Sequence, residues 1–419
     1  MTAELIDVLA CPRCDKPLDA DDSSLRCTGC EVDYPRIGGV PWLFSEPAFS
    51  IAEWRQRLDF LLRRLEDDAA RIDRTLAQRN DLLDLTRKRL EHLRDAITDH
   101  RRRLGELLSP LEAEEPRASF ATYLALRTRL PPDQGLTTYY PNMHRDWCWG
   151  GEENAAALAL LAPGLEALDA QARILVLGSG AGRLAYDLHQ SHESALTVAL
   201  DFNPLFQLAA ARLAAGETLA LYEFPLAPRT LSDQAVLREL KAPAPARPGF
   251  HAVLGDALRA PFREASFDAV VTPWLIDILP EDFATLCPRI NHLLVKGGRW
   301  LNLGSLLFGQ AAPDTQYSPE ECAVLVEAAG FATPSFNETT IPYMSSPASR
   351  HGRRETVLAW RADKIGRARR PGRHESLPDW LVKGTEPVPL LDAFRVQMTT
   401  TRIYAALMGL IDGRRSVKD

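Results

Sequence analysis

Ile174-Leu-Val-Leu-Gly-Ser-Gly-Ala-Gly-Arg183, followed by Leu196-Thr-Val-Ala-Leu-Asp201, is the stretch that decides the fold. Its leading apolar residues predict a buried strand, and a helix is expected to follow. Between them, three glycines let the chain turn tightly and approach a ligand: Gly178, Gly180 and Gly182. The second apolar run ends in Asp201, whose carboxylate can accept hydrogen bonds from both hydroxyls of a ribose. The stretch therefore predicts a βαβ unit that binds a nucleoside cofactor.

The composition is that of an ordinary globular protein. The chain has 419 residues, of which 46% are hydrophobic and 25% are charged, and this length predicts two to three domains. The net charge of −7 disfavours a general nucleic-acid binder, whose surface should be basic. No apolar run approaches the roughly 18 residues of a membrane span, and the N-terminus lacks signal-peptide features. We therefore expect a cytoplasmic protein without a membrane anchor.

Four of the seven cysteines form two CxxC pairs near the N-terminus: Cys11, Cys14, Cys27 and Cys30. Two such pairs can fold back so that four thiolates surround one structural Zn²⁺; disulfides or unreactive thiols are the alternatives. A segment this short has almost no core, so bound metal would stabilise it. Residues 1–46 are therefore predicted to form a zinc ribbon. With Tyr34-Pro35 and Gly39-Val-Pro41, they resemble the Trm112-like zinc domain, a module found beside or fused to methyltransferases.

Two segments flank the central part of the chain. Residues 47–130 carry apolar side chains at helical spacing. They predict a helical hairpin that packs on the catalytic domain or pairs two chains in a homodimer. Asn80-Asp81 either marks a bend in it or lies on the surface. Residues 363–419 predict a basic linker and a small helical tail, whose end faintly resembles peptide-binding modules of the PqqD type.

The central segment, residues 131–362, alternates short apolar strands with helices, which predicts a mainly parallel sheet covered on both faces. The expected strands are 173–177, 196–200, 250–254, 267–272, 298–304, 336–342 and 355–361. The expected helices are 152–162, 182–190, 204–215, 281–294 and 318–329. Residues 217–249 are an insertion that either shapes the substrate pocket or lies over the surface.

Three later motifs narrow the choice of cofactor. Val253-Leu-Gly-Asp256-Ala257 ends the third expected strand, Ser266-Phe-Asp-Ala-Val-Val271 begins the fourth, and Gly297-Gly298 looks like the turn before the fifth. In this order they resemble class I methyltransferases, which implies a Rossmann-like α/β domain that binds S-adenosylmethionine. By this resemblance, an acid such as Asp256 holds the adenine amino group. The implied cofactor-binding residues are Gly178, Gly180, Gly182, Arg183, Asp201, Asp256, Ala257 and Trp274.

Three more motifs concern the substrate: Arg145-Asp-Trp147, Leu275-Ile-Asp277 and Trp300-Leu-Asn-Leu-Gly-Ser-Leu-Leu-Phe308. Through them, roughly residues 60–362 resemble the N2227-like carnosine N-methyltransferases, which methylate an imidazole nitrogen of a histidine-containing dipeptide. The resemblance implies that Asp277 is catalytic. It would accept a hydrogen bond from one ring nitrogen and leave the other free to attack the methyl group. Alternatively, Asp277 caps the helix expected near residue 281. The implied substrate residues are Asp277, Trp147, Asn302 and Tyr343, with Trp149 as a further aromatic candidate.

The chain departs from that family at the substrate site. The family has a histidine in the motif LLYH that helps hold the imidazole, where this chain has Leu306-Leu-Phe308-Gly309. The family's acid on the second strand is usually Glu, where this chain has Asp201. His144 and His351 are candidate replacements for the missing histidine, although lone histidines are more often structural.

We therefore predict an N-methyltransferase that acts on an imidazole nitrogen of histidine, a histidine-containing peptide or a related small molecule. The alternatives are an RNA base methyltransferase, a peptide or natural-product methyltransferase with another nucleophile, and a non-catalytic scaffold. The absence of an Asn-Pro-Pro-Tyr-type motif, where the chain has Thr272-Pro-Trp-Leu275, disfavours the RNA enzyme.

Overall fold

The computed structural model describes residues 2–21, 23–112, 135–166, 168–279, 281–309 and 312–368. The predicted tail lies outside the described residues beyond position 368. In the described ranges, no helix is both long and apolar enough to cross a membrane.

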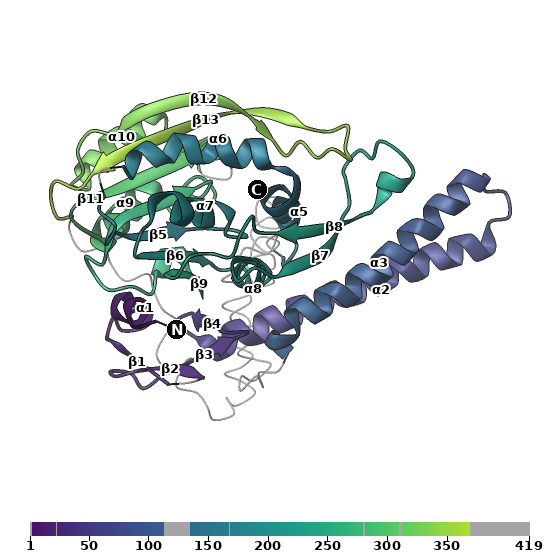
Figure 1. Ribbon diagram of the computed structural model, residues 1–419, viewed down its shortest axis with the longest axis horizontal. Coiled ribbons are helices and arrows are strands. Elements are labelled where there is room, and N and C mark those ends of the chain that lie inside the picture. Colours follow the sequence, from purple (N-terminus) through teal and green to yellow (C-terminus); the bar gives the residue numbers. More distant parts are fainter. Residues whose placement is uncertain are drawn as a thin grey trace, which may run out of the picture.

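Within the described part of the chain, one sheet of eleven strands organises the molecule (Figure 1). Across the sheet the order is β1 (Leu18–Ala20), β2 (Ser24–Cys27), β3 (Asp33–Ile37), β4 (Val40–Leu43), β9 (Phe250–Gly255), β6 (Leu196–Asp201), β5 (Arg173–Leu177), β10 (Phe267–Pro273), β11 (Leu294–Gly304), β13 (Arg353–Asp363) and β12 (Ser335–Tyr343). The strands from β4 to β11 are parallel, whereas β13 and β12 are antiparallel to their neighbours. From β9 to β12, this is the strand order of a class I methyltransferase domain.

Helices cover both faces of the sheet. They are α6 (Gly151–Leu161), α7 (Arg183–His192), α8 (Pro204–Ala214), α9 (Phe283–Leu293) and α10 (Pro319–Ala328). Because successive side chains of a strand point to opposite faces, neighbouring residues of β5 belong to different cores. Ile174 packs in a core with Leu188 of α7, whereas Leu175 packs in a core with Ile290 of α9. The predicted α/β architecture is thus confirmed.

The glycine pair near the fifth expected strand differs from its prediction, and the position of the insertion 217–249 decides between its two alternatives. The pair Gly297-Gly298 lies inside β11 rather than before it, where Gly297 has a φ of +76° and the register with β10 shifts. The insertion 217–249 forms a hairpin of β7 (Thr218–Glu223) and β8 (Val236–Lys241), which contacts helix α3 (Asp84–Glu112). The insertion does not line the large cavity described below, so it does not shape that pocket.

The N-terminal ribbon is joined to the catalytic sheet by hydrogen bonds. It consists of α1 (Ala3–Val8) and the antiparallel strands β1 to β4. Its last strand then pairs in parallel with β9, so that Trp42 lies opposite Leu254 and Leu43 lies opposite Gly255. The ribbon therefore extends the catalytic sheet at the β9 edge.

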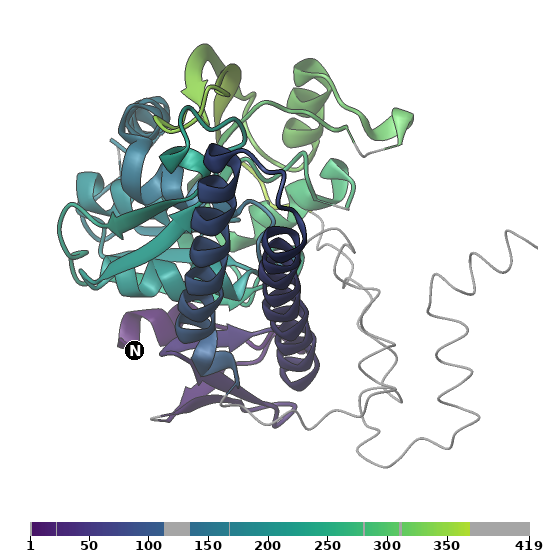
Figure 2. The same ribbon diagram turned by 90° about the vertical axis from the view of Figure 1, so that its right-hand side faces the viewer.

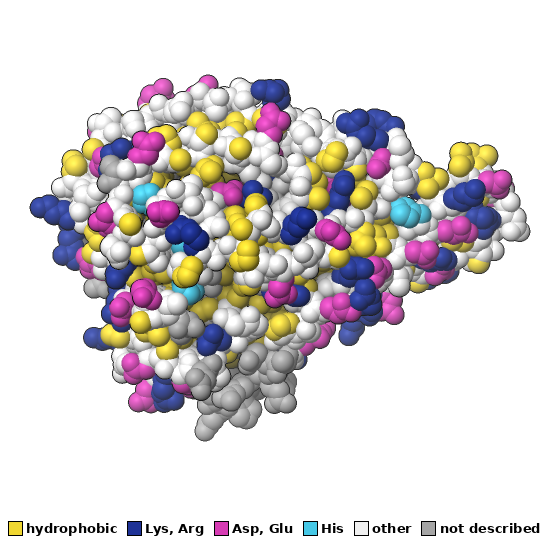
Figure 3. Space-filling view, viewed as in Figure 1, with side chains coloured by type: hydrophobic (Ala, Val, Ile, Leu, Met, Phe, Trp, Pro, Cys, Tyr) yellow, Lys and Arg dark blue, Asp and Glu magenta, His cyan; other side chains and the backbone are white. Residues whose placement is uncertain are grey.

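Residues 113–130 of the predicted hairpin lie outside the described residues. A helical hairpin is present and projects from the body of the molecule (Figure 1), and it faces the viewer in Figure 2. It consists of α2 (Pro47–Gln78) and α3 (Asp84–Glu112), and the chain reverses between them, so Asn80-Asp81 marks a bend. Basic and acidic side chains alternate along the face of the hairpin shown in Figure 3, as in the ion pairs of Arg94 with Asp73 and of Arg101 with Glu66. Buried residues of the hairpin, the ribbon and α8 form one core, which includes Trp42.

We expect the ribbon and the catalytic domain to unfold together. Trp42 is fully buried and donates a hydrogen bond of 2.6 Å from its Nε1 to the Ser50 hydroxyl. Its replacement in Trp42→Ala leaves a cavity and should lower the free energy of unfolding by about 3–5 kcal/mol. Urea unfolding followed by circular dichroism measures this change. Leu83→Ala, at a side chain that is 75% exposed, is the control and should change it by less than about 0.5 kcal/mol. A separate early transition of a small part of the signal would contradict the prediction.

Candidate functional site

The carboxyl ends of the parallel strands open into a cavity of about 530 Å³. Its lining follows the order of the strands: Phe44 and Ser45 after β4, Asp256 after β9, Asp201 at the end of β6, Gly178 after β5, Trp274 and Asp277 after β10, and Ser305 after β11. Ligands of open α/β sheets bind at this edge. Most of the predicted site residues are therefore brought together in one cavity.

The glycine loop between β5 and α7 has the conformation that its residues predict. Gly178, Gly180 and Gly182 have φ values of +67°, +55° and +84°, a region that other residues rarely adopt. A Cβ at Gly182 would lie 2.9 Å from the Cβ of Ala210, whereas one at Gly180 would meet nothing within 4 Å. Gly180 therefore leaves open space toward the cavity that it lines, and Gly182 allows close packing of α7 against α8.

Asp201 is buried beside this loop. Its carboxylate accepts hydrogen bonds of 2.9 Å from the backbone N–H groups of Gly180 and Asn203. Burial raises the pKa of Asp201 to about 6, although these two bonds oppose the rise. The carboxylate is thus held rigidly at the cavity, where it can accept the hydroxyl groups of a ribose. Directly after β9, Asp256 and Ala257 also line the cavity, and Asp256 accepts the N–H of Leu258 at 2.9 Å.

Asp277 lies on the other side of the glycine loop, after β10. Its Oδ2 accepts the backbone N–H of Leu307 at 2.6 Å, which ties it to the loop that follows β11. Burial raises its pKa, and the bond from Leu307 opposes this. Helix α9 is capped instead by Asp282, which accepts the N–H of Ala284 at 3.0 Å. The capping alternative for Asp277 is therefore excluded.

Aromatic and cationic groups are stacked at this end of the cavity. The rings of Trp274 and Tyr343 have their centroids 4.9 Å apart. The guanidinium groups of Arg353 and Arg145 lie 4.6 Å and 5.9 Å from the centroid of Tyr343. Trp274 has a φ of +52°, a strained conformation for a bulky residue, which suits a functional position.

A buried ionic group supports this stack. Arg145 pairs with Asp146 at 2.7 Å and with Glu153 at 2.8 Å. Glu153 also accepts the backbone N–H of Met344 at 3.0 Å and so links helix α6 to the end of β12. Glu153 was not among the sequence-predicted site residues. Its proximity to the Arg145-Asp-Trp147 motif was the signal that could have found it.

Several predicted residues do not line the cavity. Besides Gly182, these are Arg183, Trp147, Trp149 and Asn302. Arg183 pairs with Asp187 at 2.9 Å and lies over the ring of Trp147, whose Nε1 donates to the carbonyl of Ala181 at 2.9 Å. These two side chains therefore support the glycine loop from behind.

Asn302 and the two candidate histidines also lie away from the cavity. The amide of Asn302 is fully buried, 2.8 Å from the hydroxyl of Thr272. The Nε2 of His144 lies 3.1 Å from the carbonyl of Tyr222, and burial lowers its pKa to about 3. His351 is exposed. Neither histidine replaces the missing histidine of the family.

Residues before the catalytic domain form a wall of the cavity that was not predicted from the sequence. It includes Phe44, Glu46, Phe49, Glu53 and Trp54. The helical spacing of apolar residues from Trp54 onward predicted a buried face, but spacing does not indicate what that face covers.

The segment before the catalytic domain that begins at Tyr139 was expected either to cover the pocket or to be an ordinary packed connection. Thr138, Tyr139 and Asn142 line the cavity, before α5 (Tyr140–His144) or within it and ahead of the π-helix η1 (Arg145–Trp149).

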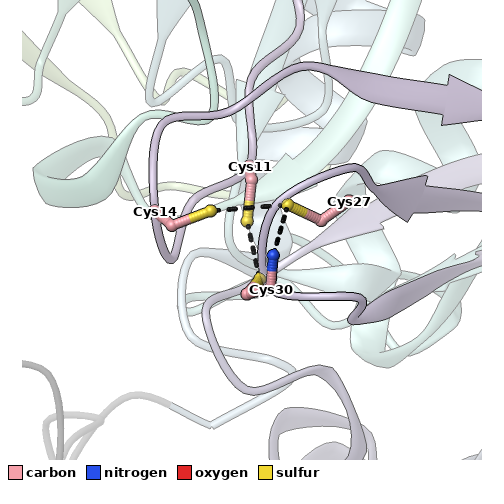
Figure 4. Close-up of side chains that lie close together, drawn as sticks. All are labelled: Cys11, Cys14, Cys27 and Cys30. Carbon is pink, nitrogen blue, oxygen red and sulfur yellow. Dashed lines mark hydrogen bonds between the residues drawn. The ribbon is translucent and has the colours of Figure 1, made fainter.

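The four N-terminal cysteines meet at one point (Figure 4). Their sulfur atoms lie within 4.8 Å of one another, with 3.6 Å between Cys11 and Cys30 and 3.4 Å between Cys14 and Cys27. A tetrahedral metal with sulfur ligands at about 2.3 Å would separate the sulfurs by roughly 3.8 Å. The N–H groups of Gly29 and Cys30 point at the sulfur of Cys27. The cluster therefore has the arrangement of a metal site.

Parts of this chain are similar to known proteins. A 55-residue stretch is 36% identical to the UPF0434 protein MS0934 of Mannheimia succiniciproducens, covering 13% of this chain and 90% of that protein. Among solved structures, the YcgJ protein from Bacillus subtilis is similar at 14% identity, over 51% of this chain and 99% of that chain, with a TM-score of 0.36. A Haloferax volcanii complex of the Trm112 methyltransferase activator with a methyltransferase is similar at 13% identity, over 55% and 96% of the two chains, with a TM-score of 0.36.

The family model for carnosine N-methyltransferase matches residues 136–364. This range contains the glycine loop, Asp201, Asp256 and Asp277. Because it spans more than half of the chain, the protein belongs to the carnosine N-methyltransferase family and is an S-adenosylmethionine-dependent methyltransferase.

Proposed function

We propose that this enzyme methylates an imidazole nitrogen of histidine, a histidine-containing peptide or a related small molecule. The observation that carries the proposal is the position of Asp277. It lines the cavity one strand away from the glycine loop and is fixed there by the N–H of Leu307. A carboxylate at this place can accept the N–H of a neutral imidazole and leave the second ring nitrogen free.

The residues present fit the cofactor and the reaction. S-adenosylmethionine supplies, when bound, a sulfonium methyl group that a neutral imidazole nitrogen can attack, with S-adenosylhomocysteine as the leaving group. Asp201 and Asp256 would hold its nucleoside, and the open side of Gly180 would admit its amino-acid part. Asp277 would orient the imidazole, stabilise the positive charge that develops on the ring and accept the N–H proton after transfer. Holding the reacting nitrogen in line is the larger part of the catalysis.

The remaining lining supports a flat substrate without phosphate groups. Trp274 and Tyr343 offer ring faces against which an imidazole can pack. The acidic and basic side chains of the described lining are nine carboxylates and two arginines. Such a lining favours neutral or cationic ligands and disfavours an RNA backbone.

The variant Asp277→Asn should lower kcat/KM for carnosine by about 100-fold or more, because the negative charge that supports the imidazolium is lost. Binding of S-adenosylhomocysteine should stay within about twofold in calorimetry. Asp282→Asn is the matched control, since Asn caps a helix as well as Asp and the residue lies outside the cavity. Equal activity of wild type and Asp277→Asn on every imidazole compound tested would refute the proposed role.

The variant Gly309→His should raise kcat/KM for carnosine about two- to tenfold, the effect of one added hydrogen bond. A Cβ at Gly309 would meet only the Leu307 side chain, at 3.7 Å, and its φ is not positive. Position 309 therefore has space for a side chain, next to the loop after β11 to which Asp277 is hydrogen-bonded. Gly309→Ala is the control and should leave the rate unchanged. No gain in Gly309→His would mean that the missing histidine does not limit the use of carnosine.

We propose that the cysteine cluster binds a structural Zn²⁺. The support is the grouping of the four sulfurs and the N–H groups directed at Cys27, which favour its thiolate. Tyr34, whose hydroxyl lies 3.0 Å from the sulfur of Cys11, closes the site on its inner side. The metal would hold together the strands that present β4 to the catalytic sheet.

The purified chain should therefore contain about one zinc per molecule by elemental analysis. Cys14→Ser should lose most of this zinc and melt at a lower temperature, because a thiolate ligand is gone. Cys148→Ser is the control, since Cys148 is exposed and far along the chain from the cluster. Full zinc content in Cys14→Ser would contradict the assignment.

Two expectations about assembly and location stay proposals. We propose that two chains can pair through the hairpin. The support is its interleaved charges and its exposed apolar side chains Phe60, Leu83 and Leu85. A cytoplasmic location rests on the unpaired cysteines.

A further inference from the structure

The first turns of α2 form one wall of the large cavity. Glu46, Phe49, Ser50 and Glu53 line it, and these positions fall on one side of a helix because they are three or four residues apart. Trp54 lines it next to them and is fully buried. All five residues precede the region that matches the carnosine N-methyltransferase family, which starts at residue 136.

The strand order places this wall at the nucleoside end of the site. Strand β4 is the parallel neighbour of β9, so the residues that follow β4 lie beside Asp256. The ring of Trp54 has its centroid 6.0 Å from the ring of Phe202, which directly follows Asp201. The methyl-transfer end, with Asp277, follows β10, which is three strands from β9 along the same edge, beyond β6 and β5.

The wall has features that suit a flat aromatic base. Phe49 is partly exposed to the cavity and offers a ring face. The Nε1 of Trp54 is a buried donor that has no acceptor among the residues the structure describes. A buried donor without an acceptor is costly in free energy, so a hydrogen bond to an acceptor on a ligand would remove this cost on binding. Adenine has ring nitrogens that can accept such a bond.

An ion pair stiffens the wall. Glu53 pairs with Arg57 at 2.8 Å, one helical turn further along α2. The guanidinium of Arg57 lies 5.0 Å from the ring of Trp54. The side chain of Glu53 is 6% exposed, so this pair is held in place rather than mobile in solvent.

We infer that the N-terminal turns of α2 form the adenine wall of the cofactor site, with Phe49 packing on the base and the Trp54 indole N–H donating to it. The inference rests on the assignment of Asp201 and Asp256 to the nucleoside and does not depend on the methyl acceptor. The helical hairpin outside the family region is thus part of the cofactor site itself.

The test is calorimetric binding of two ligands, S-adenosylhomocysteine and 5′-methylthioadenosine, which lacks the amino-acid part. Phe49→Ala should weaken both about tenfold, by the same factor, because the wall contacts only the nucleoside. Trp54→Phe keeps a ring and removes the N–H, and should weaken both at least about threefold. Phe60→Ala is the matched control on the same helix, at a side chain that is 69% exposed and outside the cavity, and should bind as wild type.

Wild-type affinity for both ligands in Phe49→Ala and Trp54→Phe would overturn the inference. So would a loss confined to S-adenosylhomocysteine, which would place the wall at the amino-acid end. Thermal unfolding shows whether each variant is folded. If Phe49→Ala does not fold, the affinities of Trp54→Phe alone test the inference. Failure of the imidazole proposal would leave these binding results unchanged, because no methyl acceptor is present in the experiment.

Discussion

The parallel run of six strands is the constraint on which the rest of the site depends. Parallel strands bring their carboxyl ends to one edge, so each strand from β4 to β11 delivers its next residues to the same cavity. The pairing of β4 with β9 carries this rule beyond the catalytic domain. It places the ribbon and the start of α2 beside Asp256, although these parts are more than 200 residues apart in the chain.

Carboxylates hold the loops around the cavity in place. Asp201 accepts an N–H from the glycine loop, Asp277 accepts one from the loop after β11, and Glu153 accepts one after β12. Each bond joins two elements that are distant in sequence. Burial raises the pKa of all three acids, and the N–H bonds oppose this and favour the charged forms. The acidic lining therefore has a positioning role besides its part in binding.

The glycine loop and the main strands could be predicted because their signals are local: φ values that only glycine adopts easily, and short apolar runs. Asp277 could be predicted from its motif. The structure excludes the alternative that Asp277 caps a helix, because Asp282 is the N-cap of α9. The positions of Trp147 and Asn302 could not be read in the same way. A motif indicates that a residue matters, but not its place. Trp147 supports the glycine loop, and Asn302 lies within β11, where its amide is buried beside Thr272. The wall at Phe49 depends on a contact between distant segments.

The pairing of β4 with β9 also bears on how the molecule avoids self-association. A parallel sheet that ended at β9 would expose a row of unpaired N–H and C=O groups, which can template aggregation. The ribbon covers this edge, so the edge strand on this side of the sheet is β1, which has only three residues. Two of those three residues are exposed, and one of them, Asp19, is charged. A short charged strand is a poor template, so the small N-terminal module shields the β9 edge of the larger domain from pairing with its own copies.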